Sequence, residues 1–535
     1  MFSSKRKKMY LCGVERSVMA SNCKYPIGIQ TFEKIREDGY VYVDKTALIY
    51  EIAHNGTYYF LSRPRRFGKS LLVSTLEAYF KGRKDLFKGL AIEKLESDWT
   101  EYPVLRVDFT GKSYTVPDDL TDQLDKLLMS MESQYGIEPN SAKPDIRFSN
   151  VIESAYEKTG KPVVILIDEY DKPIVDNLTN EELADTFRSQ LQGFYSVMKA
   201  QDQYIRFGFL TGVTKMGKMS VFSGLNNLTD ISMDLSYSTL CGISEEELRA
   251  SFGSGISAMA ENNSMSLREC YNRLADMYDG YHFHPKAQGV YNPFSLLNAL
   301  RAGEFRKYWF ATGTPSFLIK YLTKSSILLE SMNGIRATEQ TLGGVGSSRP
   351  QVITLLYQSG YLTIKGYDPE TERYTLGYPN REVESGFLES LSEYFAPSAQ
   401  LDSPLSVDKF VEDIRSGNVD MLMRRFTAFF ADMDYQIQGR AELYFQNTMY
   451  VMLKLMGQQV QVERHTSNGR IDVLIQTDKY VYILELKRDQ DPTDALDQID
   501  EKGYDWPFMA DKRKVFKIGA TFSSATRRLE NWMLA

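Results

Sequence analysis

The chain has 535 residues, which is too long for a single hydrophobic core and predicts several domains. Its hydrophobic share of 43% and charged share of 25% are those of a globular protein, and no apolar run is long enough to cross a bilayer, so no membrane partner is expected. The net charge of −7 argues against a protein that coats nucleic acid indiscriminately. The four cysteines are scattered without disulfide spacing, so we expect a reducing, cytoplasmic setting.

The first half of the chain alternates short apolar runs with helical patterns. Strands are predicted at residues 57–62, 103–109, 162–168 and 204–212, and helices at 69–80 and 180–200. Alternation of this kind is typical of a parallel sheet with helices on both faces.

After about residue 240 the pattern becomes mostly helical. Ser244 and Glu247 have the spacing of a capping box, which predicts the start of a helix. Residues 351–378 have the pattern of a helix, a strand, a polar turn and a second strand, as in a winged helix. Winged helices can enter DNA grooves, but we favour packing against the preceding domain. Residues 395–406 are rich in Pro and Ser and predict a linker, after which a small α/β domain is expected in the order helix, strand, strand, helix, strand.

A candidate phosphate-binding loop lies between the first predicted strand and the helix after it. Gly68, Lys69 and Ser70 match the end of the GxxxxGK[ST] pattern, although Arg63 stands at the position of its first glycine. We expect Lys69 to reach the β and γ phosphates of ATP, and Ser70 to coordinate Mg²⁺. The other loop residues of the predicted nucleotide site are Arg65, Arg66 and Phe67, and the two arginines contact either phosphate or another domain.

Two acids follow the third predicted strand. Asp168 is expected to hold Mg²⁺, directly or through water, and Glu169 to polarise an attacking water. The structural alternative is a pair of surface acids. Thr211 and Thr214 close the fourth predicted strand and either sense the γ-phosphate or bond to the backbone of a turn. Whether bound ATP is hydrolysed stays open.

A second cluster lies between residues 468 and 489. The runs 471–475 and 480–487 predict a hairpin, which places Glu485 and Lys487 on one face with Asp472 within reach on the partner strand. Two carboxylates beside a lysine are suited to phosphodiester hydrolysis: Asp472 and Glu485 would hold Mg²⁺ or Mn²⁺, and Lys487 would orient a water or stabilise the transition state. A cross-strand salt bridge without a metal is the alternative.

Two further residues are predicted to support this cluster. Glu442 begins an apolar helix upstream and could project one more carboxylate toward the metal. Gln498 lies on a helix downstream and could donate a hydrogen bond to the metal-binding groups.

Several motifs together resemble the bacterial AAA-ATPase-like family. They include YPIGIQTFEKIR (25–36), RPRRFGKS (63–70), LIDEYDKPI (166–174), FLTGVTK (209–215) and YDGYHF (278–283). The C-terminal third resembles the nuclease domain that often follows in this family and belongs to the PD-(D/E)xK superfamily. The resemblance implies nucleotide, metal and water-activating roles for Lys69, Ser70, Asp168 and Glu169, and a nuclease core of Asp472, Glu485 and Lys487.

The expected protein is therefore a multidomain α/β chain. Its parts are a variable extension (1–24), a P-loop domain (25–240), a helical and winged-helix-like region (241–395), a linker (396–406) and a PD-(D/E)xK nuclease-like domain (407–535). We expect an ATP-binding protein whose Mg²⁺-dependent nuclease domain cuts nucleic acid, DNA in preference to RNA, under nucleotide control. The alternative is a nucleotide-dependent switch whose nuclease-like domain is a non-catalytic binding module. Assembly into a homo-oligomer and the choice between Met1 and Met19 as the start stay open.

Overall fold

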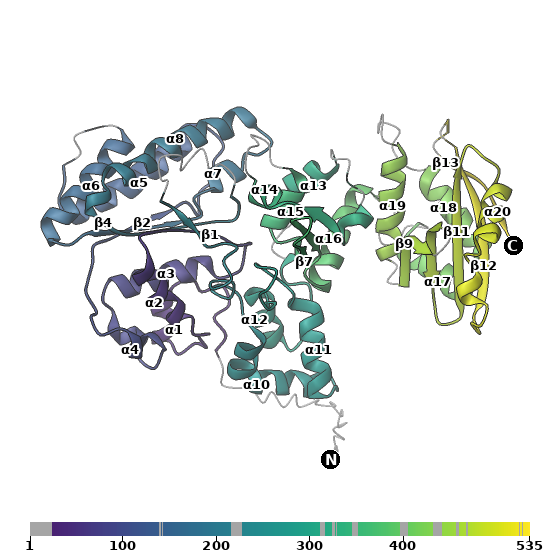
Figure 1. Cartoon of the computed structure of the whole chain (residues 1–535), viewed down its shortest axis with the longest axis horizontal. Coiled ribbons are helices and arrows are strands. Elements are labelled where there is room, and N and C mark those ends of the chain that lie inside the picture. The colour runs from purple at the N-terminus through teal and green to yellow at the C-terminus, as the bar shows by residue number, and fades with distance from the viewer. Residues whose placement is uncertain are drawn as a thin grey trace, which may run out of the picture.

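The chain forms an elongated molecule with one sheet at each end and a mainly helical region between them (Figure 1). The computed structural model describes residues 24–138, 141, 143–215, 227–310, 316–323, 327, 329–344, 351–395, 405–431, 441–455, 459–466, 469–523, 525–526 and 528–535. Almost all of the predicted extension and most of the predicted linker lie outside these residues.

The first sheet is parallel and has the strand order β2-β3-β4-β1-β5. Its strands are β1 (Tyr58–Ser62), β2 (Val104–Asp108), β3 (Val163–Asp168), β4 (Ile205–Gly212) and β5 (Thr229–Asp230). The first four were predicted to within one residue at each end. The short edge strand β5 was not predicted, because two polar residues carry no apolar pattern.

Helices cover both faces of this sheet, as expected (Figure 1). Because strand side chains alternate, Tyr59 and Leu61 pack on one face and Tyr58 and Phe60 on the other. The first face is covered by α1 (Phe32–Glu37), α2 (Thr46–Asn55), α3 (Lys69–Phe80) and α4 (Ile92–Leu95), and the second by α5 (Asp118–Tyr135), α6 (Pro144–Thr159), α7 (Lys172–Val175) and α8 (Glu181–Ala200).

The middle region begins with the predicted capping box. The Ser244 hydroxyl accepts a hydrogen bond from the Glu247 amide, and the Glu247 carboxylate accepts one from the Ser244 amide. The helices of this region are α10 (Glu245–Asn262), α11 (Leu267–Tyr278), α12 (Pro293–Ala302), α13 (Ser316–Thr323), α14 (Glu339–Gly343), α15 (Val352–Gln358) and α16 (Arg381–Phe395). A small antiparallel sheet in the order β6-β8-β7 completes the winged-helix pattern, from β6 (Ile335–Ala337), β7 (Thr363–Asp368) and β8 (Arg373–Gly377).

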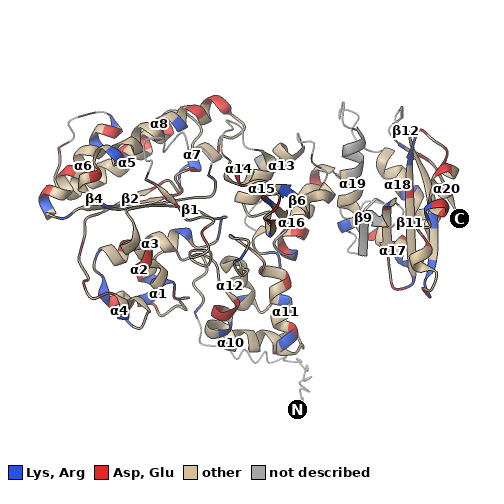
Figure 2. Ribbon diagram, in the orientation of Figure 1, with Lys and Arg blue, Asp and Glu red and all other residues tan. Residues whose placement is uncertain are grey.

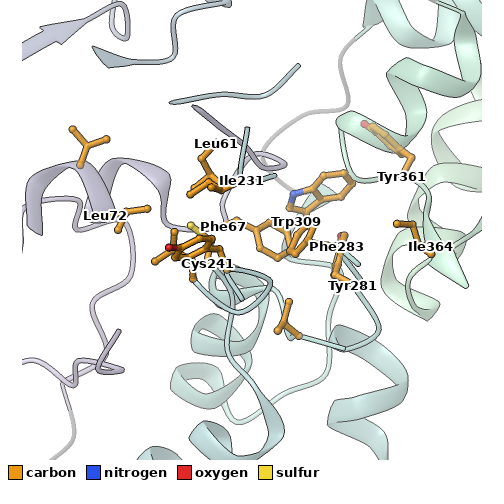
Figure 3. Packing of buried hydrophobic residues seen from close by; sticks show 14 of the residues in the cluster. Leu61, Phe67, Leu72, Ile231, Cys241, Tyr281, Phe283, Trp309, Tyr361 and Ile364 are labelled. Atoms are coloured by element: carbon orange, nitrogen blue, oxygen red, sulfur yellow. The ribbon is translucent and has the colours of Figure 1, made fainter. Parts of the chain in front are cut away.

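The middle region and the first sheet share one hydrophobic core, in which Phe67 lies next to the aromatic side chains of Tyr281 and Phe283 (Figure 3). Gly360, just after α15, approaches Pro64 so closely that a Cβ on the glycine would lie 2.7 Å from the Pro64 Cβ. The expected packing of the winged-helix-like unit against the preceding domain is therefore confirmed.

The C-terminal sheet is mixed, in the order β13-β12-β11-β10-β9, with only the β11–β12 pair parallel among its strands. Its strands are β9 (Gln459–Thr466), β10 (Gly469–Gln476), β11 (Tyr480–Arg488), β12 (Lys514–Ser523) and β13 (Arg528–Leu534), and its helices are α17 (Val407–Ser416), α18 (Val419–Ala431), α19 (Ala441–Leu455) and α20 (Pro492–Lys502). The predicted hairpin is confirmed as β10 and β11. The predicted order was wrong in two ways: it had one initial helix where the described residues form three, and it omitted β9 and β13. Both strands lie at the edges of the sheet, where polar and charged residues interrupt the apolar pattern that identifies a strand.

Helix α19 belongs to two cores. Tyr450 and Val451 pack in the core of the middle region, whereas Met452 packs in the core of the C-terminal sheet. The Asn447 side chain accepts a hydrogen bond of 2.8 Å from the Leu329 amide of the middle region. Helix α19 of the C-terminal domain therefore packs directly against the region before it.

Candidate functional site

The loop between β1 and α3 has the backbone of a phosphate-binding turn. Gly68 (φ 89°) and Arg66 (φ 71°) are both left-handed, a conformation that is easy for glycine and strained for arginine. The loop leads directly into the N-terminus of α3, where free backbone amides and the helix dipole favour an anion.

The Lys69 amine lies inside this loop. Its Nζ donates hydrogen bonds to the carbonyls of Arg63 (2.9 Å) and Pro64 (3.1 Å), and the side chain is buried. Phosphate oxygens entering the loop can replace these two carbonyl oxygens as acceptors. Ser70 follows in the first turn of the helix and is half-buried.

The remaining loop residues contact the middle region. Arg65 and Arg66 are exposed, the Arg65 carbonyl accepts a hydrogen bond from the Trp309 indole (3.4 Å), and the Arg66 guanidinium lies 4.6 Å from the centre of the Phe294 ring. Phe67 is buried in the shared core. The loop is thus in direct contact with the part of the chain that leads to the C-terminal sheet.

Arg63 is a structural cation. It is 1% exposed, and its guanidinium donates to the carbonyls of Ser62, Ser232 and Tyr237 while lying 3.9 Å from the centre of the Phe283 ring. An arginine stands where the loop pattern has its first glycine because this side chain connects the loop to the segment after β5 through buried hydrogen bonds. The sequence showed the departure from the pattern but not this role.

Asp168 ends β3 and is fully buried, so the surface-acid alternative is wrong for this residue. One carboxylate oxygen, Oδ1, accepts a hydrogen bond of 2.6 Å from the Thr211 hydroxyl, and the other, Oδ2, has no hydrogen-bond partner in the described part of the chain. A buried carboxylate oxygen without a partner is costly. The donor set therefore fits a magnesium ion or one of its water ligands.

Glu169 directly follows Asp168 at the end of β3. It adopts a left-handed backbone (φ 53°), which is unusual for a residue with a side chain. Burial raises the pKa of the Glu169 carboxyl, and the charges of Lys69 and Arg65 partly oppose that rise. The Glu169 carboxyl therefore lies close enough to Lys69 and Arg65 for their charges to act on it.

Sequence reasoning missed Asp171. This fully buried acid accepts hydrogen bonds from the Thr214 amide (2.6 Å) and the Thr214 hydroxyl (2.7 Å). Each hydroxyl donates to a carboxylate, and the Thr211 hydroxyl also accepts a hydrogen bond from the Glu169 amide (3.4 Å). The alternative in which these hydroxyls bond to the backbone therefore holds in part, for Thr211. The next residue, Lys215, donates its amide to Gln358 of α15, which connects the end of β4 to the middle region.

An apolar cavity of about 100 Å³ adjoins the loop. Its wall on the loop side is formed by Phe67, Gly68 and Leu71. The segment before β1 and the segment that leads into α10 close the other sides, and the lining is largely apolar. A flat apolar group attached to phosphates in the loop can enter here.

The second cluster lies where β10 and β11 separate. Backbone pairing runs as far as Val473 and Leu484 and is then replaced by side-chain contacts. The Leu486 amide donates to Asp472 Oδ2 (2.7 Å), and the Asp472 amide donates to Glu485 Oε2 (3.4 Å). The two carboxylates therefore face each other across the gap.

Gln498 of α20 connects this pair to the lysine. Its amide nitrogen donates to Glu485 Oε1, and its amide oxygen accepts a hydrogen bond from Lys487 Nζ. The structure thus brings together Asp472, Glu485, Lys487 and Gln498. Glu442 lies in α19, but its side chain is outside the described residues.

The electrostatics of this cluster favour a bound cation. Burial, together with the charge of Asp472, raises the pKa of Glu485 to about 8, and burial also raises the pKa of Asp472. A divalent cation between the two groups would remove this repulsion. The described part of the chain contains no group of three or more acidic, histidine or cysteine side chains that could hold a metal. At this cluster the described residues therefore offer two carboxylates, those of Asp472 and Glu485.

Tyr504, just after α20, is a further residue that sequence reasoning missed. Its buried hydroxyl accepts hydrogen bonds from the Arg470 amide (3.0 Å) and from Gln498 Nε2 (3.4 Å). No local pattern reveals this role, because it depends on the segment after α20 lying against the start of β10.

Comparisons with known proteins match both clusters. The profile of the family described as "Predicted AAA-ATPase" matches residues 26–222, and that of the PD-(D/E)XK nuclease superfamily matches residues 440–532. A protein of Azotobacter chroococcum mcd 1, described as an uncharacterized protein in the vnfD 5'region, is 38% identical over 532 residues, covering 96% of this chain and 99% of that protein. The chain belongs to the AAA-ATPase-like family. The first match of this AAA-ATPase-like protein contains the loop and its acids, and the second contains the carboxylate and lysine cluster.

The comparisons agree with the α/β multidomain fold of this AAA-ATPase-like protein. Its parallel sheet lies within the first matched segment, apart from β5, and its mixed sheet lies almost wholly within the second. Across the described residues, no helix has both the length and the apolar character needed to span a membrane.

Proposed function

We propose that this AAA-ATPase-like protein is a nucleotide-regulated nuclease that binds ATP at the loop and hydrolyses phosphodiester bonds of DNA at the C-terminal cluster. The observation that carries the proposal is the convergence of Asp472, Glu485 and Lys487 where β10 and β11 separate. A buried and a half-buried carboxylate that face each other beside a tethered amine are hard to explain by stability alone, because removing such charges from water is costly.

At the C-terminal cluster, Asp472 and Glu485 would hold Mg²⁺ or Mn²⁺, with Glu442 as a third predicted ligand. When bound, the metal lowers the pKa of a water molecule and neutralises charge on the phosphate to be cut. Gln498 holds the Lys487 amine beside Glu485, where it can orient that water or stabilise the negative charge of the transition state.

At the loop, Lys69 and Ser70 would bind the phosphates of ATP, with Arg65 and Arg66 at the exposed rim. Asp168 Oδ2 is available to a magnesium ion or its water, and Glu169 is placed to accept a proton. The apolar cavity beside Gly68 would take the base. Thr211, bonded to Asp168, would respond to the γ-phosphate.

Control by nucleotide is supported by an unbroken series of contacts. Trp309 contacts the loop and donates its amide to Glu382 of α16, Gln358 contacts the end of β4, and α16 packs on α19 of the nuclease-like domain. A change in the loop on binding ATP therefore has a route of packed elements to the C-terminal cluster.

The test is cleavage of labelled duplex DNA, single-stranded DNA and RNA by the full-length protein, with and without Mg²⁺ and ATP. We expect metal-dependent cleavage of DNA that Asp472→Asn lowers at least about a hundredfold. The matched control is Asp478→Asn, because Asp478 is an exposed acid in the turn of the same hairpin. Lys69→Ala should remove the effect of ATP and leave metal-dependent cleavage in place.

The alternative is a nucleotide-dependent switch with a non-catalytic nuclease-like module. It is favoured by the two-carboxylate ligand set, which is small for a catalytic metal among the described side chains. Absence of cleavage by the wild type, or cleavage unchanged in Asp472→Asn, would support this alternative and refute the nuclease proposal.

A further inference from the structure

Arg470 lies near Asp472 and Glu485 but is not one of the residues proposed to bind the metal. It precedes Asp472 by two residues on β10, so its side chain starts from the same face of the sheet, about 7 Å away along the strand. Unlike Glu485, which is 3% exposed, Arg470 is an exposed residue. It therefore stands at the mouth of the cluster.

The backbone at Arg470 is held by Tyr504. The Tyr504 hydroxyl accepts a hydrogen bond from the Arg470 amide (3.0 Å). The same hydroxyl lies against Gly469, where a Cβ would come within 2.5 Å of it. The start of β10 is therefore fixed relative to α20, whose Gln498 contacts Glu485 and Lys487.

The charge of Arg470 reaches both carboxylates. It lowers the pKa of Asp472 and also that of Glu485, against the upward effect of burial. Ionised Asp472 and Glu485 are balanced by Arg470 and Lys487. A divalent cation added to this group leaves two excess positive charges at the mouth, which favours a polyanion there.

We propose that Arg470 binds a backbone phosphate of the strand being cut, and this inference rests on the proposed nuclease function. A guanidinium donates two parallel hydrogen bonds to the oxygens of one phosphate, a geometry that a lysine amine does not offer. Lys487 is held inside the cluster by Gln498, whereas Arg470 reaches the solvent from which DNA arrives.

A local contact is needed because the protein has no general attraction for DNA. Its net charge is −7, and Figure 2 shows Lys and Arg interspersed with Asp and Glu along the same helices. One well-placed arginine then accounts for a large share of the electrostatic affinity at the site.

The test measures binding and cleavage of a fluorescein-labelled DNA duplex in Mg²⁺ by the full-length wild type, Arg470→Ala and Arg470→Lys. The matched control is Arg488→Ala, because Arg488 is exposed, follows Lys487 directly and so starts from the opposite face of the sheet. Binding is followed by fluorescence anisotropy at several salt concentrations, and folding is checked by circular dichroism.

We expect Arg470→Ala to weaken DNA binding about tenfold or more and to lower the slope of log affinity against log salt by about one. Arg470→Lys should keep the slope and lose affinity, since it retains the charge but not the paired hydrogen bonds. Mg²⁺ binding without DNA should persist in both variants. A purely structural arginine would not change the salt slope.

If Arg470→Ala matches Arg488→Ala in affinity and slope while the wild type cleaves DNA, the assignment of Arg470 is refuted and the proposed function stands. If the wild type neither binds nor cleaves DNA, both are refuted.

Discussion

Metal binding at the C-terminal cluster should depend steeply on pH, because Glu485 must lose a proton to become a ligand. Its pKa is raised to about 8 by burial and by the facing charge of Asp472. Protons and metal ions compete for the same carboxylate, so affinity should rise with pH up to about 8 and level off above it.

The size of the effect follows from the fraction of ionised Glu485. With a pKa of about 8, roughly 1% of this group is ionised at about pH 6 and roughly half at about pH 8. Affinity should therefore rise about fiftyfold over this interval. A glutamate with its ordinary pKa of 4.5 is ionised throughout and would give almost no change.

The assay is isothermal titration of Mn²⁺ into the full-length protein without nucleotide, at several pH values. Near pH 7 each ion bound at this site should release close to one proton, which is measured by repeating the titration in buffers of different ionisation enthalpy. Asp478→Asn should behave as the wild type, and Glu485→Gln should lose the site. Constant affinity between about pH 6 and about pH 8, with no proton released, would refute the reasoning about Glu485.

Three other predictions address the middle region and its contact with α19. Glu382 is 1% exposed, and burial raises its pKa from 4.5 to about 7. The wild type should therefore lose about 3 kcal/mol of stability relative to Glu382→Gln as pH rises from below 4.5 through about 7. Urea unfolding across that range measures this difference, and curves of stability against pH that run parallel for the two proteins would contradict it. Gly360→Ala should destabilise the protein by about 1–3 kcal/mol, because Gly360 has a left-handed backbone (φ 89°) and faces Pro64. Gly366→Ala should have a much smaller effect in the same assay, because the space around its Cβ is open. Asn447→Ala should reduce the ratio of DNA cleavage with ATP to cleavage without it, since the contact between α19 and Leu329 is lost; an unchanged ratio would show that this contact does not carry the coupling.

Much of the fold could be predicted from the sequence where burial leaves a local pattern. Strand β3 is buried along its whole length, and its uninterrupted apolar run identifies it without any tertiary information. The edge strands β9 and β13 were missed for the opposite reason, because charged residues interrupt their apolar positions. The hairpin of β10 and β11 was predictable from its alternation and its polar turn.

The candidate sites divide in the same way. Lys69, Asp168 and the acidic cluster could be named from spacing, because a loop motif and a strand-ending acid are local features. The contact of Lys215 with Gln358 joins residues 143 positions apart, and that of Tyr504 with Arg470 joins residues 34 apart. Such partners cannot be read from a local pattern.

The sequence by itself determined which residue types are present for phosphate and metal chemistry and which short segments carry them. Only the tertiary structure decided that Arg63 is a buried link, that Gln498 joins Glu485 to Lys487, and that α19 is shared by two cores. The physical reason is that backbone periodicity is set by neighbouring residues, whereas burial and hydrogen-bond partners depend on how distant segments pack.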